Sequence, residues 1–179
     1  MLLALLVATT AGPSLAADPP EGSTPPAVGA DAPSIALRDP SGAMYILSDY
    51  VGPGAAAPRR ALVLNFFATW CAPCQAELPV LGRLQARFGP QGVDVLLIDV
   101  GEKPAEVEAW LPNAPAGVRV LLDRYAVTAE RYGAAKRIPQ TFVVLADGRV
   151  ALHVQGADED LESKLSSTLE RALVTASGG

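Results

Sequence analysis

The sequence contains few of the side chains that bind metals or cross-link a fold. Its 179 residues include two cysteines, one histidine and two methionines. A structural zinc site uses about four ligands, and the chain has no second Cys-x-x-Cys pair, so structural zinc is disfavoured. Basic charge is also scarce, because the net charge is −5 and no basic run is longer than a pair such as Arg59-Arg60. Nucleic acid is therefore not an expected partner, since phosphate binding needs clustered positive charge.

Long hydrophobic runs are missing as well. The apolar run near the N-terminus, Leu2–Ala11, is followed by Gly-Pro, whereas a membrane span needs about 20 apolar residues. Ser14-Leu15-Ala16 has the small-x-small pattern that precedes signal-peptide cleavage. We therefore expect a signal peptide over residues 1–16, although no Lys or Arg precedes the apolar run. Residues 17–32 are rich in Pro, Gly and Ala and are expected to form a flexible linker.

Strands and helices are expected to alternate along the rest of the chain, which is long enough for one core and one domain. Short apolar or alternating runs predict strands over 35–37, 45–47, 61–67, 93–100 and 118–123, and a hairpin over 141–154 that turns at Asp147-Gly148. Apolar residues three or four apart and the flanking signals predict helices over 72–88, 104–111, 126–133 and 158–174. This order predicts an α/β fold with a mixed sheet.

Both cysteines lie in the stretch TWCAPC, between the expected strand and the expected helix. A disulfide that closes so short a loop stabilises a fold little, so a structural cross-link is a weak interpretation. The N-terminus of a helix stabilises a thiolate through its N–H groups and its dipole, and Pro73 suits the first helical turn. We therefore interpret the pair as redox-active. Cys71, with an exposed sulfur, attacks a partner's disulfide, and the more buried Cys74 then resolves the mixed disulfide.

Three stretches resemble one known family. LVLNFFATWCAPCQAELPVL resembles the active-site segment of the thioredoxin superfamily, and it is most similar to the exported TlpA/ResA-like thiol-disulfide oxidoreductases. IPQTFVVLADGRV resembles that family's cis-proline segment, and GADAPSIALRDPSGAMYILSDYVG is similar to its extra N-terminal hairpin. The resemblance covers roughly residues 29–174. It implies a thioredoxin fold, a mixed central sheet flanked by helices with an extra N-terminal β-hairpin, over 33–175, and leaves 176–179 as a disordered tail.

The resemblance also assigns roles to residues around the cysteine pair. Pro139 matches the family's cis-proline, and the backbone of Ile138 would pair with a substrate peptide as an added strand; an ordinary trans-proline is the alternative. Trp70 would cover the sulfurs and contact the partner, and it is also compatible with a simple core aromatic. Together with Ala72 and Pro73 of the motif, these residues form the expected substrate-binding surface.

Glu77 is an acidic residue on the apolar side of the expected helix, four residues before Leu81. A carboxylate there is costly unless it has a task. TlpA/ResA-like proteins carry a Glu near the active site three residues after the second cysteine, and Glu77 matches it, whereas Asn65 stands where thioredoxin has a buried Asp. We hypothesise that Glu77 moves a proton to or from Cys74 and tunes the pKa of both thiols. The alternative is a first-turn acid that stabilises the helix dipole.

These features predict an exported thiol-disulfide oxidoreductase that needs no metal or other cofactor. The resemblance implies a bacterial periplasmic protein, soluble or tethered by its N-terminus, which reduces a specific protein disulfide. Cytochrome c maturation and copper-centre assembly are examples of such a task, with electrons supplied by a membrane thiol donor. The protein is expected to act as a monomer.

Two further functions stay open. A copper-binding chaperone would use Cys71, Cys74 and His153, although copper-delivery relatives usually space their cysteines by three residues; otherwise His153 is a half-exposed strand histidine. The N-terminal hairpin also suggests a thiol peroxidase. Peroxiredoxins place their reactive cysteine in a Thr-x-x-Cys setting, which is out of phase with Thr69 here.

Overall fold

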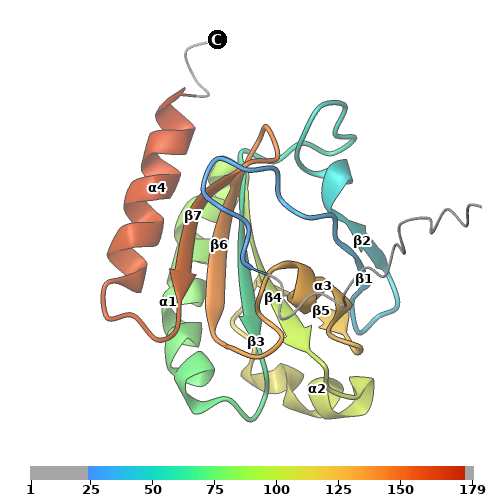
Figure 1. Ribbon diagram of the computed structural model, residues 1–179. Coiled ribbons are helices and arrows are strands. Elements are labelled where there is room, and N and C mark those ends of the chain that lie inside the picture. Colours follow the sequence, from blue (N-terminus) through green and yellow to red (C-terminus); the bar gives the residue numbers. More distant parts are fainter. Residues whose placement is uncertain (1–23, 176–179) are drawn as a thin grey trace, which may run out of the picture.

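The computed structural model describes residues 24–175, so the predictions for 1–16 and 176–179 and the first part of the linker prediction lie outside the described residues. A seven-stranded mixed sheet forms the centre, in the order β2-β1-β5-β4-β3-β6-β7 (Figure 1). The strands are β1 (Ala36–Arg38), β2 (Met44–Ile46), β3 (Ala61–Phe67), β4 (Val93–Val100), β5 (Arg119–Asp123), β6 (Gln140–Leu145) and β7 (Val150–Gln155). The α-helices are α1 (Ala72–Phe88), α2 (Pro104–Trp110), α3 (Val127–Arg131) and α4 (Leu161–Thr175).

The central strands are buried on both faces, as their continuous apolar sequences predict. Every residue of β3 is buried, and β3 pairs in parallel with β4 and antiparallel with β6. Because side chains alternate along a strand, the sheet has a core on each face. One core contains both cysteines together with residues of α1, α2 and α4. The other contains residues of α3, of β2 and of the segment before β1.

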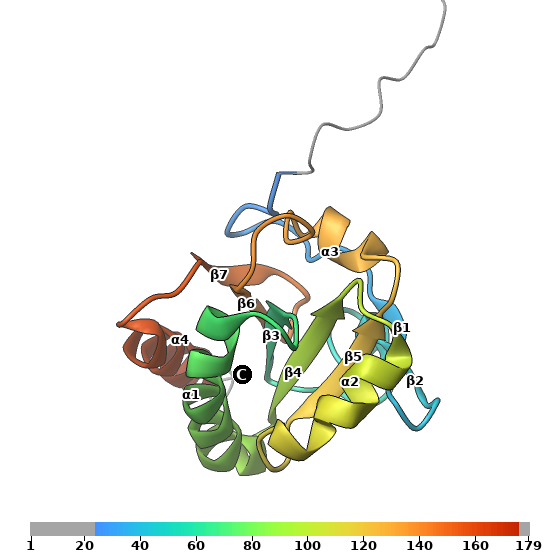
Figure 2. The same cartoon turned by 90° about the horizontal axis from the view of Figure 1, so that it is seen from below.

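One edge of the sheet gathers the loops that matter for function. The parallel strands β3, β4 and β5 end at this edge, and β6 begins there because it runs antiparallel to β3. β7 is antiparallel to β6 and so also ends there. Figure 2 looks onto this edge, with the start of α1 toward the viewer. The topology therefore brings the segments 68–71, 101–103, 124–126, 137–139 and 156–160 to one side of the molecule.

Most predicted elements are confirmed, and several boundaries move. The central strand and the first helix have the predicted limits, and the N-terminal hairpin is found with β1 and β2 within one residue of the prediction. The helix predicted over 104–111 ends at Trp110, and the chain continues as a 3-10 turn over Leu111–Asn113. Pro112 was expected to follow the helix, but it lies inside the 3-10 turn. This is possible because a proline in the first turn of a helix costs no internal hydrogen bond. The helices predicted from 126 and 158 begin at Val127 and Leu161.

The folded part begins ahead of residue 33. The N–H of Gly29 donates to the carbonyl of Val150 at 2.7 Å, and the N–H of Ala32 donates to the carbonyl of Gly148 at 2.9 Å. Arg149 Nη1 in turn donates to the carbonyl of Gly29 at 2.8 Å. Residues 29–32, expected as the end of a flexible linker, are therefore hydrogen-bonded to the β6–β7 hairpin. Within residues 24–175, no helix is long and apolar enough to cross a membrane.

Candidate active site

The cysteine pair lies at the junction of β3 and α1. Cys71 is the N-cap residue of α1, and its sulfur accepts the N–H of Cys74 at a distance of 3.3 Å. The two sulfurs form a disulfide, with the Cα atoms 5.3 Å apart. Pro73 lies in the first helical turn, where its missing N–H costs no hydrogen bond. The end of the helix thus directs an N–H group at the Cys71 sulfur, as the interpretation of a stabilised thiolate requires.

The two cysteines differ less in exposure than predicted. Cys74 is fully buried, and Cys71 is only 4% exposed. Cys74 is the more buried of the two, as predicted, but the prediction of an exposed sulfur at Cys71 is wrong for the disulfide form. The reason is that the sulfur is bonded to Cys74 and turned toward the first turn of α1.

The surface beside the cysteines is apolar and accessible. Trp70 is 72% exposed, so it is not a core aromatic, and Ala72 and Pro73 are exposed next to it. The Ile138–Pro139 peptide bond is cis, as predicted. Ile138 is half-buried against the core that contains both cysteines. Of the predicted substrate-binding residues, Trp70, Ala72 and Pro73 are thus exposed beside the cysteines, and Ile138 packs against the core that contains them.

Glu77 lies in the second turn of α1 and is 6% exposed, which excludes the alternative of a first-turn acid. One carboxyl oxygen, Oε2, accepts a hydrogen bond from Asn65 Nδ2 at 3.0 Å. The other oxygen has no hydrogen-bond partner among the described residues. Burial raises the pKa of Glu77 to about 7, against the opposing effect of the Asn65 hydrogen bond, and the negative charge of Asp158 adds to the rise. A group with this pKa exchanges its proton near neutral pH.

Asn65 links α1 to β6, the strand that follows the cis-proline. Its Nδ2 also donates to Thr141 Oγ1 at 2.9 Å, and Asn65 and Thr141 face each other across the β3–β6 pair. Thr141 lies two residues after Pro139. A buried polar path therefore runs from Glu77 through Asn65 to the segment expected to bind substrate. Sequence reasoning missed Thr141, and its position just after the cis-proline was the available signal.

Thr69, the residue before Trp70, is held by polar contacts that sequence reasoning also missed. Its N–H and its hydroxyl donate to the two carboxyl oxygens of Glu102, at 2.7 and 2.5 Å. Its carbonyl accepts a hydrogen bond from Gln75 Nε2 at 3.0 Å. The single hydroxyl proton of Thr69 is thus donated to Glu102 and not to a cysteine sulfur. The position of Glu102 just after a buried strand was the available signal.

His153 does not belong to this site. Its ring stacks on Phe142 with the centroids 4.3 Å apart, and its Nε2 lies 2.8 Å from Gln140 Oε1. Phe142 belongs to the core on the opposite face of the sheet from the cysteines. Among residues 24–175, no group of three or more potential metal ligands is found. The set Cys71, Cys74 and His153 is therefore not brought together.

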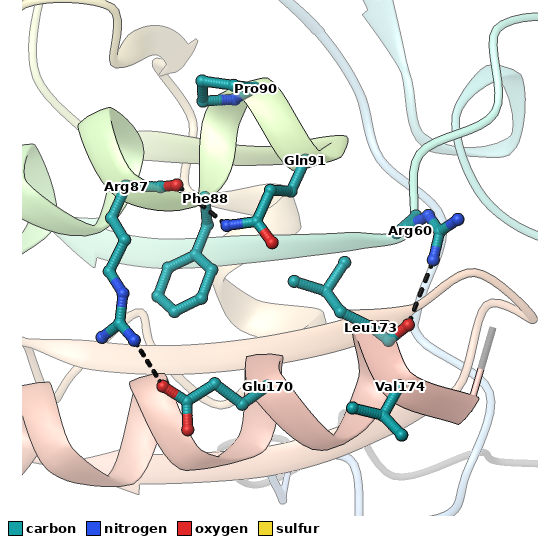
Figure 3. Close-up of a pocket in the computed structure, with 8 residues that line it drawn as sticks. All are labelled: Arg60, Arg87, Phe88, Pro90, Gln91, Glu170, Leu173 and Val174. Carbon is teal, nitrogen blue, oxygen red and sulfur yellow. Dashed lines mark hydrogen bonds and ion pairs between the residues drawn. The ribbon is translucent and has the colours of Figure 1, made fainter. Parts of the chain in front are cut away.

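A surface pocket of about 770 Å³ lies at the other end of α1 (Figure 3). Since α1 has 17 residues and a helix rises 1.5 Å per residue, the pocket is about 25 Å from the cysteines. Arg87 pairs with Glu170 at 2.6 Å across it, and Arg60 donates to the carbonyl of Leu173 at 3.1 Å. The lining contains no redox-active side chain; it consists of Arg60, Arg87, Phe88, Pro90, Gln91, Glu170, Leu173 and Val174. The pocket is not part of the redox site.

A cysteine pair at the start of a helix, opposite a cis-proline on a mixed sheet, defines the thioredoxin-like class of thiol-disulfide oxidoreductases. Residues 28–153 match the model of the AhpC/TSA family, so the chain belongs to that family. It is 33% identical over 143 residues to the thiol-disulfide oxidoreductase ResA of Geobacillus thermodenitrificans, covering 79% of this chain and 78% of that protein. For ResA of Bacillus subtilis the identity is 32% over 128 residues, with coverages of 72% and 67%.

Solved structures agree with this assignment. A protein of Chlorobium tepidum described as a thiol:disulfide interchange protein DsbE has 28% identity and a TM-score of 0.72, covering 83% of this chain and 99% of that one. The exposed lipoprotein thioredoxin of Streptococcus pneumoniae has 26% identity and a TM-score of 0.63, with coverages of 78% and 99%. The predicted fold is thereby confirmed, and the chain is a thiol-disulfide oxidoreductase.

Proposed function

We propose that this protein reduces a specific protein disulfide outside the cytoplasm. The observation that carries the proposal is the position of Cys71 at the N-cap of α1, where its sulfur accepts the N–H of Cys74. In the reduced protein this N–H group and the helix dipole favour a thiolate at Cys71 over one at the fully buried Cys74. The thiolate is the species that attacks a disulfide.

The reaction takes place in two exchange steps. The Cys71 thiolate attacks one sulfur of the substrate disulfide, forms a mixed disulfide and releases the other substrate sulfur as a thiolate. Cys74 then loses its proton, attacks the Cys71 sulfur and releases the second substrate sulfur. The substrate gains two electrons and the cysteine pair loses two. The Cys71–Cys74 disulfide seen in the structure is the product form.

Glu77 accepts the proton of Cys74 in the second step. Cys74 and Glu77 are three residues apart on α1 and therefore lie on the same side of the helix. A fully buried thiol does not ionise readily without a base, because burial disfavours the charged form. Glu77 has an oxygen without a hydrogen-bond partner among residues 24–175 and a pKa of about 7, which are the properties of a base for this step.

The substrate binds across the exposed residues next to the pair. An extended peptide adds to the backbone of Ile138 beside the cis bond and packs against Trp70, Ala72 and Pro73. Support comes from the 72% exposure of Trp70 and from the cis bond itself. A large exposed aromatic side chain supplies contact area to a partner at low entropic cost.

A location outside the cytoplasm is supported by the apolar N-terminal sequence and by the relationship to an exposed lipoprotein thioredoxin. In a bacterium this is the periplasm, with the protein soluble or tethered by its N-terminus. The chain acts as a monomer on a partner in cytochrome c maturation or copper-centre assembly. Because such compartments are oxidising, it takes its electrons from a membrane thiol donor.

The reduction potential of the cysteine pair tests the direction of the reaction. Full-length protein is equilibrated with defined ratios of reduced and oxidised dithiothreitol, and the fraction of disulfide is measured by thiol alkylation. A potential near or below about −250 mV supports a reductant. A potential near about −120 mV, the value of a strong oxidant, would overturn the proposed direction.

A further inference from the structure

The hydrogen bonds of Thr69 fix the segment that leads into the cysteine motif. Glu102 accepts from both the N–H and the hydroxyl of Thr69. Gln75 donates to the Thr69 carbonyl, and Gln75 Oε1 accepts in turn from Trp110 Nε1 at 3.3 Å. Residues of α1 and of the loop after β4 thus hold Thr69, two positions before Cys71, and Trp110 of α2 holds Gln75 in turn. A residue held at its N–H, its hydroxyl and its carbonyl has little freedom to change its backbone direction.

Asp99 lies near the end of β4, three residues before Glu102. It is fully buried, and its Oδ2 accepts the N–H of Glu102 at 3.2 Å, whereas Oδ1 has no hydrogen-bond partner among the described residues. Burial and the neighbouring Glu102 raise the pKa of Asp99 to about 8. The negative charge of Asp123 on β5 also raises the pKa of Asp99. The negative charge of Glu130 on α3 in turn raises the pKa of Asp123. The charges that act on Asp99 are thus those of carboxyl groups.

The two carboxyl groups therefore differ in their bonding. Glu102 accepts two short hydrogen bonds from Thr69, at 2.7 and 2.5 Å. Asp99 accepts one longer hydrogen bond and is the better place for a proton. Two neighbouring buried carboxyls do not both ionise readily, because like charges in a medium of low dielectric repel strongly.

We propose that Glu102 and Asp99 are positioning residues for disulfide exchange. Asp99 holds a proton, and Glu102 keeps Thr69 in place through its two hydrogen bonds. Thr69 in turn fixes Trp70 and holds Cys71 at the N-cap of α1. When Asp99 loses this proton, it gains a negative charge beside the Glu102 carboxyl, and Glu102 releases its hold on Thr69. This role depends on the exchange activity and not on its direction.

The test compares variants of the full-length protein in the exchange reaction. We measure the rate of mixed-disulfide formation with a small aromatic disulfide between pH 6 and pH 10. In Glu102→Ala the rate at pH 7 is expected to fall by about tenfold, because a misplaced reacting group loses rate steeply. Glu108→Gln is the matched control, since it removes an exposed carboxylate from neighbouring α2 and should leave the rate unchanged.

Asp99→Asn separates positioning from a merely structural role. The amide cannot lose a proton, so this variant should keep the rate at pH 7 and lack the decline that we expect for the wild type above about pH 8. Thr69→Val removes only the hydroxyl donor and should lower the rate in the same direction as Glu102→Ala, which keeps the test informative if Glu102→Ala does not fold. Equal pH profiles for wild type, Asp99→Asn and Thr69→Val would overturn the inference. Absence of exchange in the wild type would instead refute the activity itself.

Discussion

Two buried glutamates near the cysteine pair differ in what surrounds their carboxyl oxygens. Both oxygens of Glu102 accept hydrogen bonds from Thr69. Glu77 has one oxygen bonded to Asn65, and the other has no partner among residues 24–175. Hydrogen bonds to a carboxylate favour its ionised form, whereas burial without them favours the neutral acid. Glu102 therefore holds the backbone of Thr69, whereas Glu77 can exchange a proton.

The largest effect that distinguishes the two glutamates is expected in the pH dependence of exchange. Glu77→Gln should lower turnover at pH 7.5 by about 10²-fold, the usual contribution of a general base, and should remove the rise in rate near pH 7. Glu102→Gln should keep that rise. Turnover of a disulfide substrate is measured against pH for both variants. An unchanged profile for Glu77→Gln would contradict its role in proton transfer.

The pH dependence of folding stability gives a second test of Glu77. The ordinary pKa of Glu77 is 4.5, and its pKa in the folded protein is about 7, so between these pH values the folded protein binds more protons than the unfolded chain. The free energy of unfolding should therefore fall as the pH rises through this range. Glutamine does not titrate. The free energy of unfolding of Glu77→Gln, taken relative to that of the wild type, should therefore be about 3 kcal/mol higher at pH 8 than at pH 4.

Urea unfolding of the oxidised protein at these two pH values measures the change. The oxidised form is used so that the cysteines do not titrate. Glu108→Gln is again the control, with the same free-energy difference from wild type expected at both pH values. If Glu77→Gln behaved like this control, Glu77 would titrate normally and the contrast with Glu102 would disappear.

A smaller effect is expected at the exposed surface. Trp70→Ala should slow exchange with a peptide disulfide by about tenfold, because the variant loses aromatic contact area with the partner. Exchange with a small disulfide should change little, since such a substrate does not reach across the surface. Rates with the two substrates are compared in the same variant. An equal loss with both would place Trp70 in the positioning of the cysteines rather than in substrate binding.

The smallest effect is expected on the other face of the sheet. His153→Ala removes the stack on Phe142 and the contact with Gln140, and it should cost about 1 kcal/mol of stability without changing the exchange rate. Thermal unfolding and turnover are measured together. A marked loss of turnover, or of Cu(I) binding by the reduced protein, would revive a role for His153 at the redox site.

The parts of the fold that the sequence predicts are those that depend on local pattern. The apolar run 61–67 has to be a buried strand, and the spacing of Leu78, Leu81 and Leu84 has to form a helix with one buried side. The same spacing predicts the burial of Glu77. The cis bond at Pro139 came from the family resemblance and not from any local pattern.

What the sequence does not predict depends on contacts between distant residues. Asn65 and Thr141 are 76 residues apart, and Thr69 and Glu102 are 33 apart; both pairs meet only because of strand register and loop geometry. The exposure of Cys71 depends on its bonding to Cys74, which a sequence pattern does not contain. Periodicity thus predicts which side of an element is buried, and it does not predict which polar groups meet there.

The division of labour between the two cysteines is tested most directly by trapping the mixed disulfide. Cys74→Ser and Cys71→Ser are each reacted with a peptide disulfide, and the adducts are located by mass spectrometry over time. We expect a stable adduct on Cys71 in the first variant and almost none on Cys74 in the second. Equally rapid formation of an adduct on Cys74 would contradict the account, because it would show that the helix N-terminus does not select the attacking sulfur.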